Sequence, residues 1–520
     1  MPGIIKRIFS SLWVLVPACV ILLTMALYPI GRALICPPYP YQLDYAEGFL
    51  AVESQMMARG ESIYPTLEDY PYLVGNYPPV YPALCAPFFL LFGPSLLWGR
   101  LICVLSAVGI AICMVVIIYN RTKGILPRGE VLPIVLAPLL FWNTYALYEW
   151  IGYARVDLPA IFFGLIGLAM LSGEINKPRL RMAILFFLLS IFTKQIQVFA
   201  PLSAMIFLFL KERKTGLYFL KWFLGLFLVI FIFLILATRG QYFLHTVTYN
   251  ANVFELWQLK VWIGHLFRLY PFYLLAFLLL GGVVIYDYLS KRGTGKTSPP
   301  DLFSIYAIVG GLSFLTIGKV GAASNYLLEF HVALSIFTCI KIAALVQYPR
   351  ETRTKTKAMV LIILVGALLN LHAIHVVRAR RMLFSRPNPG KGSFEKGNKM
   401  LEIISEYPDP ILCEQPIFLL LAGKKVLFQP FIMSQLHKEG KWDQTPVMED
   451  IRQKSFSLIM TGQDVTGEGH FWQYTPEMVG AIRDHYTPLL SGRPLTRNFL
   501  ESPLGGIPYF IYIPEREDHD

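Results

Sequence analysis

The chain has 520 residues, of which 55% are hydrophobic and only 15% are charged, and its mean hydropathy is +0.52. Soluble domains carry about 25% charged residues, so this composition excludes an ordinary soluble enzyme and indicates a polytopic membrane protein. The net charge of +12 comes from basic residues in short loops between apolar runs, which is a feature of membrane topology and does not indicate a nucleic-acid partner.

Windows of about 20 apolar residues predict about eleven membrane-spanning helices. The first run, at residues 12–35, is too long for a typical signal peptide, so we expect an uncleaved span with a cytoplasmic N-terminus. The predicted spans are residues 12–35, 97–119, 130–147, 158–171, 182–192, 198–210, 217–237, 270–289, 302–317, 326–346 and 358–377.

The loops between these spans alternate in charge along the whole chain. Every second loop is rich in Lys and Arg, whereas the loops between them are aromatic and mixed in charge. Because cytoplasmic loops are enriched in Lys and Arg, the alternation places the C-terminal tail outside the cell membrane. The basic loops are residues 121–130, 174–182, 211–216, 290–298 and 348–357.

The first outer loop, residues 36–96, begins with an acidic stretch. Residues 41–60 read YQLDYAEGFLAVESQMMARG and carry Asp44, Glu47 and Glu53 directly after the first span. Moving a carboxylate into hydrocarbon costs about 2.5–3.5 kcal/mol even on the hydrophobicity scales that give the lowest values. Three acidic residues this close to a bilayer therefore require an explanation. Two interpretations stay open, an active-site loop that faces the outside and a solvated juxtamembrane helix. Further along, residues 76–93 are apolar but rich in proline, which predicts a segment lying on the membrane.

Other polar residues stand at the outer ends of later spans. They are Arg155 and Asp157 in YARVD, Lys194 in FTKQIQ, and Lys319, Asn325 and Glu329 in GKVGAASNYLLE. With the predicted topology they converge with Asp44 and Glu47 on one outer surface. Such a set fits an anionic, lipid-borne substrate, with a carboxylate as the base and Lys or Arg as phosphate ligands. The alternative for each cation is a flanking residue that reaches to the lipid headgroups.

The tail, residues 379–520, has the composition of a soluble domain. Buried strands are predicted within residues 409–428, 455–462 and 506–514, and helices at residues 446–454 and 476–485. We therefore expect an all-α polytopic membrane domain at residues 1–378 and a small extracytoplasmic α/β domain at residues 379–520.

The cysteine and histidine pattern does not predict a metal site. The seven cysteines are scattered and form no CxxC pair, so neither a zinc site nor a disulfide framework is indicated. A divalent metal ion is compatible with an anionic substrate, but a cationic pocket can supply the same electrostatic stabilisation.

Several of these stretches together resemble a known family. The chain is similar to the GT-C superfamily of glycosyltransferases that use polyprenyl-phosphate sugars. More narrowly, it resembles the bacterial protein O-mannosyltransferase and aminoarabinose-transferase-like (ArnT-like) branch. The resemblance covers nearly the whole membrane part. The segments that carry it are LDYAEG, the turn ARGESIYP at residues 58–65, YPPVYPALCAPFFLLFGPSLLWGRL at residues 77–101, ARVDLPAIFFGLIGLAML, FTKQIQVFAPLSA and NYLLE.

The resemblance implies roles for individual residues. Asp44 takes the place of the family's presumed base, and Glu47 that of its second acidic position. Asp157 is similar to the acidic residue of the second outer loop, and Lys194 to a lysine near the donor phosphate. The implied reaction moves a sugar, with inversion, from a polyprenyl-phosphate donor to a hydroxyl of a protein, lipid or glycan on the outer face. One departure from the aminoarabinose transferases is that Gly75 and Asn76 stand where those enzymes carry Glu-Lys.

Two other classes remain as alternatives. A transporter or lipid flippase predicts ionisable residues near the bilayer midplane and symmetry-related repeats, whereas the charges here lie at outer ends and no repeat is evident. A non-catalytic scaffold, whose tail binds envelope partners, leaves the pattern of Asp44, Asp157 and Lys194 unexplained.

Overall fold

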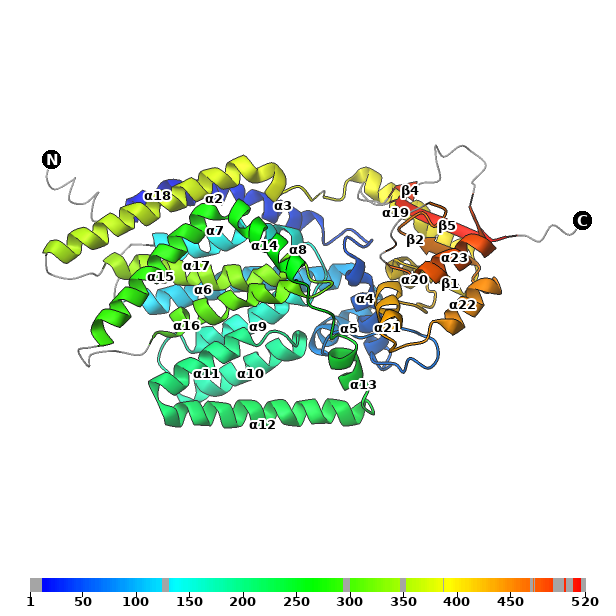
Figure 1. The fold of residues 1–520 in the computed structure, drawn as a ribbon, viewed down its shortest axis with the longest axis horizontal. Helices are drawn as coiled ribbons and strands as arrows, with labels where there is room; N and C mark the ends of the chain where they lie inside the picture. Colours follow the sequence, from blue (N-terminus) through cyan, green and yellow to red (C-terminus); the bar gives the residue numbers. More distant parts are fainter. Residues whose placement is uncertain are drawn as a thin grey trace, which may run out of the picture.

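The computed structural model of the protein describes residues 12–123, 131–292, 300–346, 352–386, 388–467, 471, 473–489, 500–501 and 508–515. Helices form a long bundle, and a small sheet with its own helices lies at one end of the molecule (Figure 1). The helices are η1 (Leu12–Leu15), α2 (Val16–Met25), α3 (Leu27–Ile35), α4 (Tyr45–Ala58), α5 (Val80–Phe92), α6 (Leu96–Thr122), α7 (Leu132–Trp142), α8 (Tyr145–Trp150), α9 (Asp157–Met170), α10 (Lys177–Thr193), α11 (Phe199–Lys211), α12 (Arg213–Ala237), α13 (Gln241–Phe243), η2 (Leu244–Thr248), α14 (Leu256–Leu269), α15 (Pro271–Arg292), α16 (Leu302–Val309), η3 (Gly311–Gly318), η4 (Ser324–Leu327), α17 (Leu328–Val346), α18 (Thr352–Leu383), α19 (Lys391–Glu406), α20 (Pro416–Leu421), α21 (Pro430–Lys438), α22 (Thr445–Arg452) and α23 (Pro476–His485). The strands are β1 (Ile411–Cys413), β2 (Leu458–Thr461), β3 (Tyr486–Pro488), β4 (Leu500–Glu501) and β5 (Pro508–Pro514).

The apolar runs are helical, as a backbone inside a bilayer must satisfy its own hydrogen bonds. Within the described residues, six helical segments are long and apolar enough to cross a membrane. They are Trp13–Ile35, Leu96–Thr122, Arg213–Ala237, Pro271–Ser290, Ser324–Leu345 and Thr356–Leu383. Shorter apolar helices accompany them, so the predicted class of an all-α polytopic membrane protein is confirmed, while the count of eleven spans stays a prediction.

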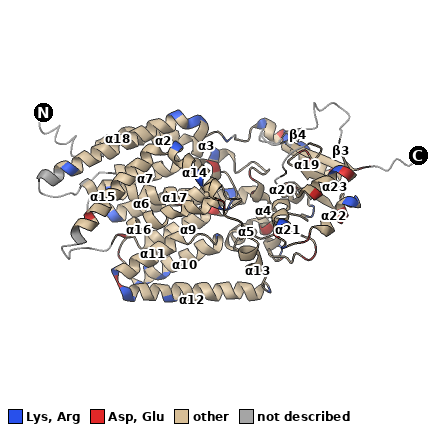
Figure 2. Ribbon diagram, viewed as in Figure 1, with Lys and Arg blue, Asp and Glu red and all other residues tan. Residues whose placement is uncertain are grey.

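Charged residues gather near the ends of the helices and on the tail, with long uncharged stretches between (Figure 2). The basic loops at residues 174–182 and 211–216 lie in the described part of the chain. Residues 124–130, 293–299 and 347–351, which make up much of the other three basic loops, lie outside it. The predicted orientation of the termini therefore stays a prediction.

One predicted span, at residues 130–147, is interrupted. Its described residues form α7 and then the first half of α8, with a break at Asn143 and Thr144. The Asn143 side-chain amide donates to the carbonyl oxygens of Leu139 (2.7 Å) and Leu22 (2.9 Å), and the Thr144 hydroxyl accepts from the Leu147 N–H. Side chains thus replace the backbone hydrogen bonds that the break removes.

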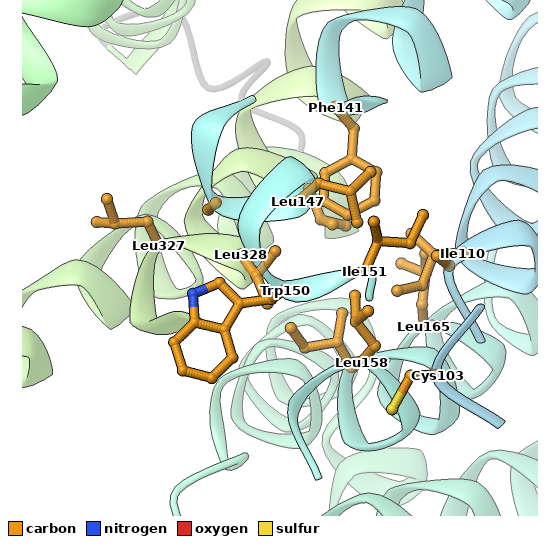
Figure 3. Packing of buried hydrophobic residues seen from close by; sticks show 14 of the residues in the cluster. Cys103, Ile110, Phe141, Leu147, Trp150, Ile151, Leu158, Leu165, Leu327 and Leu328 are labelled. Carbon is orange, nitrogen blue, oxygen red and sulfur yellow. The ribbon is translucent and has the colours of Figure 1, made fainter. Parts of the chain in front are cut away.

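The short helix α8 is packed inside a buried apolar cluster (Figure 3). Leu147 and Ile151 are fully buried, and Trp150 is only 5% exposed. They pack with Leu158 on α9 and Leu328 on α17, both also buried. This end of the helices is therefore rigid, since close-packed side chains have little room to move.

The tail is an α/β unit, as expected. Its sheet has the order β1-β2-β5-β3, with β4 paired to β5. Strands β1 and β2 are parallel, whereas β5 is antiparallel to its neighbours. One expectation was wrong in detail, because Pro416–Leu421 inside the predicted strand region forms helix α20. Proline at the start of this run cannot donate to a sheet but suits the first turn of a helix.

The tail is docked on the first outer loop. The Tyr72 N–H donates to the Leu427 carbonyl (2.8 Å), and the Gln429 N–H donates to the Tyr72 carbonyl (3.1 Å). Two side-chain hydrogen bonds extend this contact, from Tyr70 to Asp450 and, at 2.5 Å, from Tyr41 to Asn398. Helix α18 ends at Leu383, five residues beyond the boundary expected at residue 378, and the tail follows it.

Candidate active site

Asp44 stands at the N-cap of α4, where a short polar side chain is strongly preferred. Its carboxylate accepts a hydrogen bond from the Ala46 N–H (3.1 Å) and pairs with Arg155 Nη1 (3.0 Å). Burial raises the pKa of Asp44 above its ordinary value, although the Arg155 charge opposes the shift. The side chain keeps 23% of its surface exposed, so a substrate proton can reach this carboxylate.

Glu47, one helical turn later, has a different environment. Both its side chain and that of Arg100 are completely buried, and the two form a bidentate pair at 2.8 and 2.9 Å. Glu47 also accepts hydrogen bonds from the N–H groups of Leu43 and Ala154. Burial alone would raise its pKa, but the Arg100 charge and these hydrogen bonds outweigh burial and hold the pKa below its ordinary value.

The remaining N–H groups of Arg100 hold the chain that leads to Asp44. They donate to the carbonyl oxygens of Cys36, Tyr39 and Tyr41. The geometry therefore gives Glu47 and Arg100 a positioning role for the loop, and the prediction that Glu47 is catalytic stays a prediction.

Arg155, Asp157 and Lys194 come together as the sequence predicted. Lys194 Nζ forms an ion pair with Asp157 Oδ1, and the Asn325 amide donates to the same oxygen (2.8 Å). Arg155 Nε lies 3.9 Å from the other oxygen, Asp157 Oδ2. The carboxylate of Asp157 therefore neutralises Lys194 directly and Arg155 in part.

Aromatic rings line the same cations. Lys194 Nζ lies 4.2 Å from the centre of the Tyr326 ring, and the Arg155 guanidinium lies 5.1 Å from that of Trp150 on α8. A cation over an aromatic face is attracted to the ring quadrupole, so the rings fix where these charges stand.

Lys319 belongs to this group but lacks an acidic partner. Its Nζ donates to the backbone carbonyl and to the side-chain Oδ1 of Asn250, the latter at 2.9 Å. Among the described residues no carboxylate forms an ion pair with it. Burial, and then the nearby Lys194 charge, lower the pKa of Lys319 to about 8.

Glu329 lies beside the cluster rather than in it. Its carboxylate accepts hydrogen bonds from Gln197 and Tyr306, and neither of these belongs to the Arg155–Asp157–Lys194 group. The prediction that Glu329 binds substrate is untested by this geometry.

Several neighbours were not selected from the sequence. The Tyr77 hydroxyl lies 3.4 Å from Arg155 Nη2, and Gln195, next to Lys194, donates to the Asn76 carbonyl (2.9 Å). Arg100 could have been found, because an arginine inside an apolar run is costly and requires a buried partner. Within the described residues, no group of three or more His, Cys, Asp or Glu side chains is arranged to hold a metal ion.

No family model and no curated protein sequence matches this chain. Solved structures do match it. The crystal structure of ArnT from Cupriavidus metallidurans bound to undecaprenyl phosphate has a TM-score of 0.52 and 10% sequence identity, and the match covers 96% of this chain and 98% of that chain. The chain has the same fold as this ArnT. The apo state of the same ArnT matches with a TM-score of 0.51 and 12% identity, over 95% of this chain and 97% of the other.

This fold agrees with the family resemblance expected from the sequence motifs. Because the match covers nearly the full length of both chains, the likeness includes the first outer loop and the tail as well as the helical bundle. The multi-pass membrane character of the chain follows from the same likeness and from its apolar helices. At 10–12% identity the likeness shows the fold alone.

Proposed function

We propose that the protein is an integral-membrane glycosyltransferase. It transfers a sugar, with inversion, from a polyprenyl-phosphate-linked donor to an acceptor hydroxyl on the outer face of the cell membrane. The acceptor is a protein, a lipid or a glycan. One structure with the same fold, ArnT, holds undecaprenyl phosphate, which supports a lipid-phosphate donor. The observation that carries the proposal is the pairing of a half-buried carboxylate, Asp44, with Arg155, together with the Lys319 cation, which lies near Lys194 and has no acidic partner among the described residues.

In this mechanism the Asp44 carboxylate removes the proton from the acceptor hydroxyl. The hydroxyl oxygen then bonds to the anomeric carbon of the sugar, and the bond from that carbon to the phosphate oxygen breaks. The lipid phosphate leaves with the bonding electron pair as an anion. General-base help of this kind typically contributes about 10²–10⁴ in rate.

Two cations are suited to the leaving phosphate. Arg155 presents a planar set of donors although it pairs with Asp44, and Lys319 has no carboxylate partner among the described residues. Lys194 was expected at the phosphate, and this stays a prediction, but its direct pair with Asp157 favours Lys319 for that role. We therefore assign Lys319 and Arg155 to the phosphate and give Lys194 the role of orienting Asp157. Fixed positive charge at a developing anion is a large source of rate enhancement, so this mechanism does not require a metal ion.

The test is Asp44→Asn in purified protein reconstituted into liposomes with a sugar-loaded undecaprenyl phosphate and candidate acceptors. Asparagine keeps the size and most hydrogen bonds but cannot take the proton, so turnover should fall about 10²–10⁴-fold with donor binding retained. Glu61→Gln, an exposed acid on the same loop, is the matched control and should keep its turnover. Near-normal turnover in Asp44→Asn would remove Asp44 as the base. Movement of the lipid across the bilayer without release of sugar would instead identify a flippase.

A further inference from the structure

Two amide side chains near the cluster are held by their N–H ends. Gln195 Nε2 donates to the carbonyl oxygens of Asn76 (2.9 Å) and Thr246 (3.0 Å), and Asn325 Nδ2 donates to Asp157 Oδ1 (2.8 Å). Carbonyl and carboxylate oxygens can only accept hydrogen bonds. The side-chain atom that contacts them must therefore be the amide nitrogen, and the other atom is the amide oxygen. The oxygens Gln195 Oε1 and Asn325 Oδ1 point away from these contacts, are buried, and have no hydrogen-bond partner in the described part of the protein.

Two further orphan acceptors stand in the same place. Asn76 Oδ1 and Asp157 Oδ2 are also buried without a hydrogen-bond partner among the described residues. Two hydrogen bonds, one ion pair and one peptide link connect all four groups, because Gln195 donates to the Asn76 carbonyl, while Lys194, its neighbour in the chain, pairs with Asp157, which accepts from Asn325. Four chain segments that are far apart in sequence therefore contribute acceptors near the charged cluster. The mechanism above uses none of the three amides.

The chemistry of these oxygens selects one part of a lipid-linked sugar. An orphan acceptor requires a donor from its ligand, and native proteins leave few buried acceptors unsatisfied. The oxygens of an ionised phosphate only accept, and a prenyl chain has no polar group. Among the parts of the donor, only the sugar carries O–H groups. The cations Arg155 and Lys319 thus suit the phosphate, and the amide oxygens suit the sugar.

We propose that Asn76, Gln195 and Asn325 form a subsite that binds the hydroxyl groups of the donor sugar. The inference rests on the proposed function, because it assumes that a polyprenyl-phosphate sugar occupies the cluster. Since the three side chains are uncharged amides that offer acceptor oxygens, the sugar class that the subsite recognises is one with several free hydroxyls. Gln195 and Asn76 are only half-buried, so the subsite borders the accessible surface.

The same local pattern occurs away from the cluster at Asn370 and at Asn143, and the second serves as a control. Asn143 is fully buried, its N–H groups donate to Leu22 and Leu139, and its Oδ1 has no partner among the described residues. It lies at the break between α7 and α8, and neither of these two partners belongs to the charged cluster. An orphan amide oxygen alone is therefore not diagnostic, and the position beside Arg155 and Asp157 is what indicates a ligand.

The experiment measures binding in nanodiscs without acceptor, so that hydroxyls of an acceptor cannot contribute. The probes are undecaprenyl phosphate alone and undecaprenyl phosphate carrying mannose, glucose or galactose. The quantity of interest is the gain in affinity that a sugar gives over the bare lipid phosphate. Asn76→Leu is the cleanest variant, because the backbone carbonyl that holds Gln195 remains. Gln195→Met is the second variant, and Asn143→Leu is the matched control.

For the wild type, at least one sugar should bind more tightly than the bare lipid. Asn76→Leu and Gln195→Met should each lower that gain about 5- to 30-fold, the effect of one or two lost hydrogen bonds, and leave the bare lipid's affinity unchanged. Asn143→Leu should keep the full gain. A gain retained in both subsite variants, or lost equally in Asn143→Leu, would overturn the subsite. So would a wild type that binds the bare lipid but gains nothing from any sugar. A wild type that binds neither probe would contradict the proposed function itself.

Discussion

The guanidinium of Arg100 shows how a single buried charge can position a loop. All of its donors are used, two on Glu47 and the others on three backbone carbonyls of the segment that precedes Asp44. Such a pair need not stabilise the fold more than apolar side chains of the same shape would. The pair instead fixes the backbone conformation of residues 36–44, because three carbonyl oxygens of this segment accept hydrogen bonds from the same guanidinium.

Arg100→Lys tests this role. Lysine keeps the charge but has a single nitrogen, so it cannot serve Glu47 and all three carbonyls. Each buried acceptor left without a donor costs about 1–3 kcal/mol, and the free energy of unfolding should fall by at least that amount. The measurement is denaturation of the purified protein in detergent. The exposed Arg452 on α22 supplies the control, since Arg452→Lys should change stability by no more than about 0.5 kcal/mol. Equal effects of the two variants would refute a special role for Arg100.

Lys319 gives a pH prediction. Its pKa is lowered from 10.5 to about 8, so in the free protein the ammonium is charged below pH 8 and increasingly neutral above it. If the charge holds the donor phosphate, affinity for undecaprenyl phosphate should begin to fall between pH 7 and 8, where the ammonium starts to lose its proton, and weaken further above pH 8. The lipid's own second ionisation, near pH 6, lies below this window. Lys319→Arg should flatten the profile because a guanidinium stays charged. A wild-type profile that is flat to pH 9.5 would exclude Lys319 from the phosphate site.

At the residue scale, the charged residues and Asn325 were predictable from the sequence, whereas the amides of Asn76 and Gln195 were not. Arg155, Asp157, Lys194 and Asn325 were selected because polar groups at the ends of spans are costly, and the structure places them in contact. Gln195 was passed over, although it adjoins Lys194, because a neutral amide in a loop is common. Its significance depends on the Asn76 carbonyl, which is 119 residues away.

At the scale of elements, hydropathy located the helices but not their interruptions. A window of apolar residues reports length and composition, and both are the same whether or not the helix is broken within it. The break between α7 and α8 depends on Asn143 reaching Leu22, 121 residues earlier in the chain. Helix α20 was missed for a related reason, because a short apolar run fits a buried strand and a buried helix equally well.

The contact between α19 and the first outer loop can be tested with one methyl group. A Cβ at Gly397 would lie 2.1 Å from the ring of Tyr41, whereas a Cβ at Gly480 on α23 would meet nothing within 4 Å. Alanine normally stabilises a helix interior by about 0.8–1.0 kcal/mol relative to glycine. Gly480→Ala should show this gain, while Gly397→Ala should destabilise the protein by about 1–3 kcal/mol through overpacking. The measurement is thermal unfolding, and a gain in both variants would show that α19 is not pressed against Tyr41.

At the scale of the whole molecule, the alternation of basic loops predicts a cytoplasmic N-terminus and a tail outside. The seven cysteines are all buried, so the native thiols should react little with a labelling reagent. In spheroplasts, Gln453→Cys on the tail should react with a membrane-impermeant maleimide. Lys214→Cys, in the first turn of α12, should react only after permeabilisation. The reverse pattern would invert the topology and place Asp44 on the inner side.

The docking of the tail on the first outer loop also joins segments that are made at different times. Tyr70 and its partner Asp450 are 380 residues apart. At about 5–20 residues per second, roughly 20–80 s pass between the synthesis of the two. For most of that interval the loop that carries Asp44 exists, while the Leu427 carbonyl that Tyr72 will bind does not. The contact between this loop and the tail is therefore among the last to form in the protein's biosynthesis, and a chain released before residue 427 carries Asp44 without that contact.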